Sequence, residues 1–426
     1  MILALLAAFQ VTTADSLPRV TLAEALSQGV RLDPDYVQAI GSIGTAEWGR
    51  RAALITLVVP SVTASSDYSF FSRDQFNIGT GQPARRNASG RIDARLEIFA
   101  GGRKLAELSR ARAELEGAQA NEVLTRYTSA LFIEGTYYDV LGGRELLEVA
   151  RGRLRRAEEG FTIARARVLS GAAVQSDSLQ LLLELNSARV GLLRSEVALR
   201  SARLDLGRRI GRRGAVDAAP LDTVALPDLP YSLPQLVSLA LESGPEYRVA
   251  RANERQADAV VRGRRGSYLP TIALSGNIAA FDENWFPNAL TRRTGVISLS
   301  LPLWDNGQRE LNVARARASR DVARAIREDL ERGAEADVTL AYDTFITARA
   351  TLDLDRNALL VARENFRVQE TRYRAGASTI LDLLEAQDQL TEAEANVVRS
   401  RYAIRLAIAG LEAVLGRRLL NDRTEP

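Results

Sequence analysis

The sequence contains no cysteine and no histidine among its 426 residues, and Met1 is its only methionine. Without cysteine and histidine, the chain cannot use a thiol nucleophile or a histidine-based triad, and it cannot form a disulfide or the usual kinds of zinc site. It also has no methionine-rich or histidine-rich tract that would favour soft metals. We therefore expect neither enzymatic activity nor a bound cofactor or metal ion.

Long apolar stretches are also scarce. Charged residues make up 26% of the chain, which is too many for a protein with several membrane-spanning helices. One apolar run, from Ile2 to Phe9, precedes the small residues up to Ala14, so we expect residues 1–14 to be an export signal peptide. No other run reaches the roughly 18 apolar residues of a spanning helix. Any membrane crossing would therefore be made by strands.

Neither sign of charge dominates, because 56 Lys and Arg stand against 53 Asp and Glu, and the formal net charge is only +3. Lys104 is the only lysine, so nearly all of the basic residues are arginines. Acidic and basic residues alternate along the predicted helices, as they do between Glu107 and Glu116. This interleaving is typical of a solvated helix face and not of a basic patch, so we expect no nucleic-acid partner.

The sequence does contain an internal repeat. Gly171 recurs as Gly376 and Leu206 as Leu411, each 205 positions later. The offset is 211 at Pro34, 210 at Pro60 and 205 from Phe99 on, so the first copy has a loop about five residues longer between residues 60 and 99. The expected segments are a first structural repeat at 15–219, a linker at 220–232, a second structural repeat at 233–418 and a C-terminal tail at 419–426.

Both copies predict the same order of elements. A helix of moderate length comes first and ends at Pro60 or Pro270, because proline cannot continue a helix. Two strands follow, and then a long helical hairpin whose turn lies at Gly171 or Gly376, where the chain reverses. The expected ranges in the first and second copies are about 21–58 and 233–267 for the first helix, 60–100 and 270–304 for the strands, and 103–210 and 308–415 for the hairpin. The proline-rich segment 217–234 is expected to link the copies.

The predicted strands alternate between apolar and polar residues. In the first copy Ile92, Ala94, Leu96 and Ile98 fall on one face, and Arg91, Asp93, Arg95 and Glu97 fall on the other. A soluble antiparallel sheet with one wet face would show the same alternation. Aromatic residues near both strand ends favour lipid, because they resemble two interfacial girdles. These aromatics are Tyr68, Phe70, Phe71, Phe76, Phe281, Trp285 and Phe286 on the loop side, and Phe99, Tyr268 and Trp304 on the helix side.

Four strands cannot close a barrel, for which roughly eight are the minimum, so several chains would have to share one barrel. The return helices show a heptad pattern with one bulky and one small position, which is typical of closely packed coiled coils. The bulky positions are Leu383, Leu390, Val397, Ile404 and Leu411 in the second copy, and Leu185, Leu192, Leu199 and Leu206 in the first. Tyr127, Tyr137 and Tyr138 are expected to pack between helices and to bind no ligand.

Short motifs recur in a fixed order along the chain. They are Thr21 to Leu26 followed by Asp33-Pro34, the prolines Pro60 and Pro270 before the strands, the corners at 98–102 and 302–307, and the segments 372–376 and 381–384. Each motif alone is moderately specific. In this order, and twice over, they resemble the outer-membrane efflux proteins typified by TolC, over essentially the whole mature chain.

The resemblance implies a mainly α fold with a small β part. In this fold a homotrimer builds a 12-stranded β-barrel in the outer membrane and a 12-helix α-barrel in the periplasm. It further implies an exit duct of a tripartite efflux or type I secretion system, surrounded by outer-membrane lipid. The implied partners are a periplasmic adaptor and an inner-membrane transporter of the RND, ABC or MFS type. The alternative is a structural coiled-coil envelope protein without channel activity, and the substrate stays open.

The resemblance also implies roles for residues at the helical tips. Asp382 and Glu385 match acidic rings that narrow the pore, although an ordinary solvated face would look the same. Asp177 and Tyr373 match positions that latch the closed tips through hydrogen bonds, but Ser378 replaces the arginine of the family's prototype. Asp177 could instead be an acid favoured by the helix dipole. The turns that would contact the adaptor contain Gly171, Ala172, Gly376 and Ala377.

Overall fold

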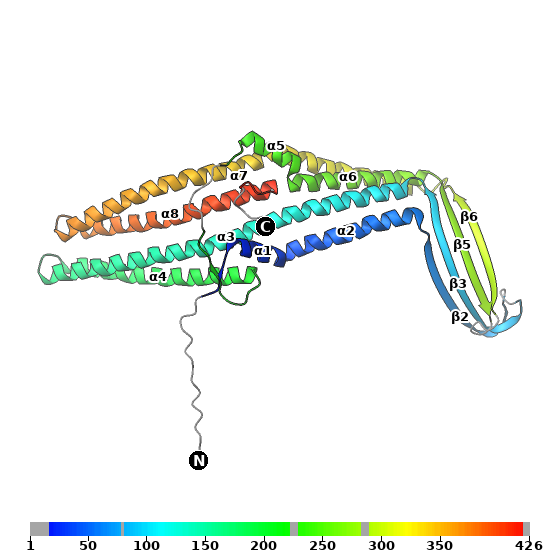
Figure 1. Cartoon of the computed structure of the whole chain (residues 1–426), viewed down its shortest axis with the longest axis horizontal. Coiled ribbons are helices and arrows are strands. Elements are labelled where there is room, and N and C mark those ends of the chain that lie inside the picture. Colours follow the sequence, from blue (N-terminus) through cyan, green and yellow to red (C-terminus); the bar gives the residue numbers. More distant parts are fainter. Residues whose placement is uncertain (1–16, 78–80, 222–228, 283–288, 421–426) are drawn as a thin grey trace, which may run out of the picture. The chain divides into compact units, whose positions relative to one another are not determined.

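The computed structural model describes residues 17–77, 81–221, 229–282 and 289–420 (Figure 1). The signal peptide expected at 1–14, the aromatics Trp285 and Phe286, and most of the expected C-terminal tail lie outside these residues. The chain divides into two compact units. One comprises Met1–Gln38, Val123–Gly244 and Ala334–Pro426, and the other comprises Ala39–Glu122 and Pro245–Gly333. Each unit combines segments of both sequence copies, so the repeats do not form separate compact bodies. The repeat boundaries themselves remain a prediction.

The leading helix is broken in both copies. Asp33 separates α1 (Leu22–Leu32) from α2 (Pro34–Val58), and Gly244 separates α5 (Leu233–Ser243) from α6 (Pro245–Arg265). Both separating residues are extended, with ψ of 123° and 132°. A residue before proline is driven out of the helical region, and proline readily begins a new helix. The expectation of one continuous helix over 21–58 and over 233–267 was therefore wrong.

The long helices α3 (Arg103–Leu169) and α7 (Gln308–Arg374) each contain 67 residues, and they pair with α4 (Gln175–Arg209) and α8 (Ile380–Leu415) as hairpins (Figure 1). Burial of the bulky heptad positions confirms the predicted seam, since Ile404 and Leu411 are fully buried. Among the described residues, no helix combines the length and the apolar character needed to cross a membrane.

The first unit has its main core beside the start of the chain. A short parallel pair joins β1 (Arg19–Val20) to β4 (Asp217–Ala218), so part of the predicted linker 217–234 is a strand. Tyr127, Tyr137 and Tyr138 are buried, which confirms their predicted packing. The Tyr137 hydroxyl donates to the carbonyl oxygen of Ala219 at 2.7 Å. Burial, as the largest cause, raises the pKa of Tyr137 to about 12, so this hydroxyl keeps its proton at physiological pH.

The second unit contains an antiparallel sheet of four strands in the order β2 (Ser61–Phe76), β3 (Pro83–Ala100), β5 (Thr271–Asp282) and β6 (Leu290–Ser300). A single turn of 3-10 helix, η1 (Gly266–Tyr268), precedes β5. Every residue of β6 is exposed, and large apolar side chains such as Ile98, Ile278 and Ile297 are exposed across the sheet. The strands β2 and β6 form its two edges. Both the apolar face and the edges are thus open in a single chain.

Candidate functional site at the helical tips

The two helical hairpins end in turns of the same geometry. In each turn, two backbone N–H groups donate to carbonyl oxygens five and three residues back, at 2.8 and 3.0 Å respectively. The donors are Ala172 and Gly171 in the first turn, and Ala377 and Gly376 in the second. This is the Schellman arrangement, which needs a left-handed residue, and both glycines have φ of 75°. All four residues are exposed, as a contact with a partner would require.

The start of α8 is capped by the side chain of Thr379. Its hydroxyl accepts from the backbone N–H of Asp382 at 3.2 Å, and the Asp382 carboxylate accepts from the backbone N–H of Thr379 at 3.0 Å. This reciprocal capping box satisfies two backbone donors that the helix leaves unpaired. Hydrogen bonds from the Thr379 backbone and hydroxyl are the main causes that lower the pKa of Asp382. Asp382 is therefore both exposed and firmly ionised at neutral pH.

The second predicted gate residue lies on the same exposed face of α8. Glu385 is exposed and accepts a hydrogen bond from the side-chain amide of Gln389 at 3.1 Å. Three residues further on, Asp388 forms an ion pair with Arg153 of α3 at 3.1 Å. The structure thus brings Asp382 and Glu385 together and leaves both unburied. Of the three acids at this spacing, only Asp388 forms an ion pair among the described residues.

Tyr373 is held in a buried position under the tips. Its side chain is only 1% exposed and packs with Leu181, Ile380 and Leu383. Among the described residues its hydroxyl has no hydrogen-bond partner. Burial and then the negative charge of Asp177 raise the pKa of Tyr373. Asp177 is therefore close enough to act on this hydroxyl electrostatically, although the two form no hydrogen bond within the described chain.

Arg167, near the end of α3, connects the two hairpin tips. One guanidinium nitrogen donates to the carbonyl oxygen of Tyr373 at 2.6 Å, and the other donates to the carbonyl oxygen of Ala172 at 3.3 Å. The guanidinium carbon also lies 4.7 Å from the centre of the Tyr373 ring, within the range of a cation–π interaction. Arg167 was not among the residues predicted from the sequence, where its one signal is its repeat counterpart Arg372.

Further ion pairs join the hairpins above the tips. Arg153 of α3 pairs with Glu184 of α4 at 2.8 Å as well as with Asp388 of α8. Arg156 of α3 pairs with Glu394 of α8 at 3.1 Å, and neither side chain is more than 19% exposed. Partial burial makes such pairs less sensitive to screening than surface pairs. These contacts fix the hairpins along α3 and leave the tips as their free ends.

No group of three or more acidic side chains in the described part of the chain is placed to hold a metal ion. What the tips present instead is a pair of small exposed turns, an exposed acidic face on α8 and a buried tyrosine braced by an arginine.

Comparison with known protein families identifies the family of this chain. The sequence model described as "Outer membrane efflux protein" matches residues 51–212 and 236–417, which is most of the chain and covers both copies. The chain belongs to this family. Membership confirms the resemblance inferred from the sequence, and with it the outer-membrane location and the role of an exit duct. The helical hairpins are accordingly the periplasmic part of an outer-membrane efflux protein.

Individual relatives agree with this assignment. The chain is 28% identical to Protein CyaE of Bordetella pertussis over 417 residues, covering 93% of this chain and 85% of the relative. It is 28% identical to the pyoverdine export outer membrane protein OpmQ of Pseudomonas aeruginosa, covering 79% and 71%. The crystal structure of the Campylobacter jejuni CmeC outer membrane channel shares its fold, with a TM-score of 0.80, 15% identity, and coverage of 95% of this chain and 87% of that one.

Proposed function

We propose that three copies of this outer-membrane efflux protein form one continuous duct. The observation that supports this best is the four-stranded sheet with two open edges and an exposed apolar face. In a membrane, every backbone N–H and C=O must be paired, so an open sheet has to close on itself or on copies of itself. Four strands are too few to close alone, and three chains supply the twelve of the expected barrel.

The duct takes its substrates from a periplasmic adaptor joined to an inner-membrane transporter of the RND, ABC or MFS type. The exposed turns at Gly171–Ala172 and Gly376–Ala377 are the proposed adaptor contacts, since small side chains allow helical tips to meet closely. The names of the relatives range from pyoverdine export to cobalt-zinc-cadmium resistance, so family membership does not fix the substrate.

The assembly and the channel can be tested together on detergent-purified protein. We expect a protein mass of three 46.5 kDa chains by light scattering, and stepwise conductance after reconstitution into planar bilayers. A monomer in detergent that conducts nothing in bilayers would contradict the proposal. That result would favour the alternative, a structural coiled-coil envelope protein.

The acidic face of α8 is the proposed aperture of this duct. Threefold symmetry would place three copies of Asp382 and of Glu385 around the axis, and a ring of carboxylates attracts cations. Asp382 suits this role because its capping hydrogen bonds lower its pKa and keep it charged. Asp177, Tyr373 and Arg167 form the proposed latch of the closed tips, since the Tyr373 hydroxyl has no hydrogen-bond partner among the described residues.

Replacing both Asp382 and Glu385 by alanine should weaken the cation selectivity of the channel, because each ring loses its fixed charge. The measurement is the reversal potential in bilayers under a salt gradient. Asp353→Ala is the matched control, because Asp353 is an exposed acid on α7 whose partner is the surface residue Arg356. If the double variant and the control have the same cation selectivity, neither Asp382 nor Glu385 lines the aperture.

A further inference from the structure

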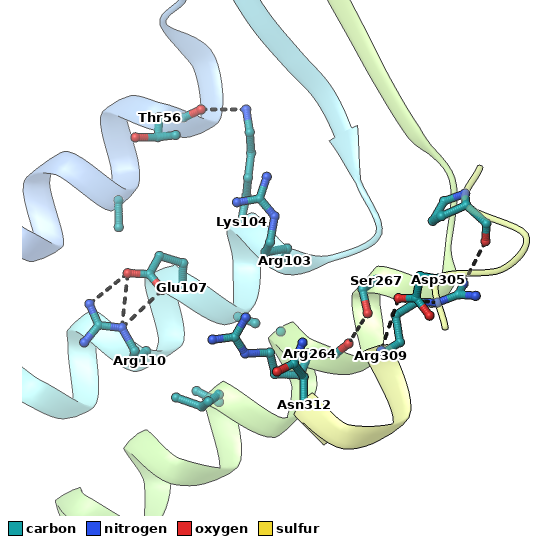
Figure 2. A pocket seen from close by; sticks show the side chains of 16 residues that line it. Thr56, Arg103, Lys104, Glu107, Arg110, Arg264, Ser267, Asp305, Arg309 and Asn312 are labelled. Carbon is teal, nitrogen blue, oxygen red and sulfur yellow. Dashed lines mark hydrogen bonds and ion pairs between the residues drawn. The ribbon is translucent and has the colours of Figure 1, made fainter. Parts of the chain in front are cut away.

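The second unit contains a cavity of about 690 Å³ where the strands meet the helices (Figure 2). Its walls come from α2, α3, α6 and α7, together with the segment that leads into α7. The corner is tightly built, since Gly101 has φ of 59° and a Cβ there would lie 2.1 Å from the carbonyl oxygen of Gly266. Close backbone approach of this kind fixes the start of α3 against η1. The walls are therefore preformed.

Among the charged residues that line the cavity, cations outnumber acids. Arg103, Lys104, Arg110, Arg264 and Arg309 line it, against the acids Glu107 and Asp305. Carboxylates neutralise three of these cations, because Arg103 pairs with Glu97, Arg110 with Glu107 and Arg309 with Asp305. Lys104 and Arg264 are the two that remain.

Neither Lys104 nor Arg264 forms an ion pair with a carboxylate of the described residues, although the two are placed differently. The Lys104 ammonium donates to the backbone carbonyl oxygens of Thr56, at 2.7 Å, and of Glu97. An ammonium has three donors, so one is left over. The exposed Arg264 guanidinium makes no hydrogen bond or ion pair with any described residue. Figure 2 shows the two on opposite sides of the cavity, on α3 and α6.

The start of α3 carries charge of the sign that a helix disfavours there. Its first turn contains Arg103 and Lys104 and no acid. Helix N-termini are positively polarised and favour anions, so two cations add to the field instead of cancelling it. The corresponding first turn of α7 has Glu310 beside Arg309, so an acid balances the cation there. The preference of helix N-termini for acidic residues is thus broken at α3 and met at α7, and such a local exception is expected at a functional site.

The cavity lies on the polar side of the sheet. Arg103 donates to the carboxylate of Glu97 at 2.5 Å. Glu97 belongs to the polar face of β3 together with Asp93 and Arg95, and it lies just before the bulge at which the pairing with β5 shifts. A sheet that spans a membrane turns its polar face away from lipid. An occupant of this cavity therefore arrives from water and not from the bilayer.

We propose that this cavity binds a dissolved multivalent oxyanion, such as the phosphate or clustered carboxylate groups of a solute. Lys104 and Arg264 supply charge-assisted hydrogen bonds to it, which are about twice as strong as neutral ones. The binding is a property of one chain. Its placement along the interior of a duct rests on the proposed function, in which three such cavities form a cationic zone distant in sequence from the acidic tips.

The test uses inorganic pyrophosphate as the probe and full-length protein in detergent. In isothermal titration calorimetry, the double variant Lys104→Gln/Arg264→Gln should bind pyrophosphate about tenfold more weakly or worse, because it loses both unneutralised cations. Arg262→Gln is the matched control, since Arg262 is exposed on α6 but does not line the cavity, and it should leave binding unchanged. In bilayers, pyrophosphate should lower the conductance of the wild type and not of the double variant.

Three results would overturn the inference. They are no binding of pyrophosphate to the wild type, equal binding by the wild type and the double variant, and binding of phosphatidylglycerol in mixed micelles without binding of pyrophosphate. The last result would make the cavity a lipid site. Failure of the proposed channel function would give a different result. The protein would then bind pyrophosphate through Lys104 and Arg264 but conduct no current, so the binding site would stand and only the channel proposal would be wrong.

Discussion

Arg167→Ala should release the helical tips and raise the resting conductance of the reconstituted channel. The substitution removes hydrogen bonds to the carbonyl oxygens of Tyr373 and Ala172, together with the cation–π contact to the Tyr373 ring. Hydrogen bonds from charged donors contribute about 1.5–3 kcal/mol, and a partly exposed cation–π contact about 1 kcal/mol. A loss of roughly 2 kcal/mol would increase the population of separated tips more than about tenfold.

The chain offers an unusually close control for this experiment. Arg372 occupies the equivalent position of the second hairpin. Its guanidinium donates to the carbonyl oxygen of Ala377 in its own turn, at 3.3 Å, and its charge also acts on Asp382 of α8, but within the described chain it makes no hydrogen bond to the first hairpin. Arg372→Ala should therefore change the resting conductance much less. Arg167→Lys should have an intermediate effect, because an ammonium keeps the charge but loses the planar fork. If the two alanine variants conduct alike, Arg167 does not brace the tips.

The difference between Arg167 and Arg372 could not be predicted from the sequence. The internal repeat pairs these arginines, and it pairs Tyr373 with Val168. Only Tyr373 offers an aromatic face, so only Arg167 can combine a carbonyl with a ring. A repeat predicts that two residues share a local environment. It does not predict which one reaches across to the other copy, since that contact depends on how the hairpins pack.

The long helices were predictable because their signals are local. Heptad spacing fixed the faces of α4 and α8, and the left-handed residues Gly171 and Gly376 fixed the turns. The break before Pro34 was just as local and was overlooked, because the helix pattern continues on both sides of it. The Thr379–Asp382 capping box, a polar pair three residues apart, is an equally local feature that was not predicted. Contacts between segments that are distant in sequence could not be predicted from these local signals.

One buried contact of this kind among the described residues is an ion triad made by Arg418, Glu134 and Glu412. Arg418 pairs with Glu134 of α3 at 2.9 Å and with Glu412 of α8 at 2.5 Å, and none of the three side chains is more than 8% exposed. The Tyr138 hydroxyl donates to Glu134 at 3.2 Å, and the backbone N–H of Leu419 donates to Glu412 at 3.0 Å. Burial by itself would lower the pKa of Arg418, but the charges of Glu134 and Glu412 outweigh it and raise the pKa.

Arg418→Ala should destabilise the first unit by about 3–5 kcal/mol, because it leaves two buried carboxylates without their cation. Thermal unfolding followed by circular dichroism should show a Tm lower by about 5 °C or more. Arg417→Ala is the control. Exposed Arg417 donates to the hydroxyl of Tyr231 at 3.3 Å and lies over its ring, and it forms no ion pair with any residue that the structure describes. A Tm equal to that of Arg417→Ala would mean that the triad does not hold the C-terminal segment.

The pH dependence of the Arg418→Ala variant separates a charge effect from lost packing. Without Arg418, burial and mutual repulsion should raise the pKa of Glu134 and Glu412 in the folded state above their unfolded values. A group with a raised pKa takes up a proton on folding, so the stability lost at neutral pH should partly return as pH falls through that raised pKa. Adding Glu134→Gln to Arg418→Ala should restore part of the Tm at pH 7, because one buried charge is removed. A deficit that is the same at pH 5 and pH 8, and that Glu134→Gln does not reduce, would assign the loss to packing of the arginine side chain alone.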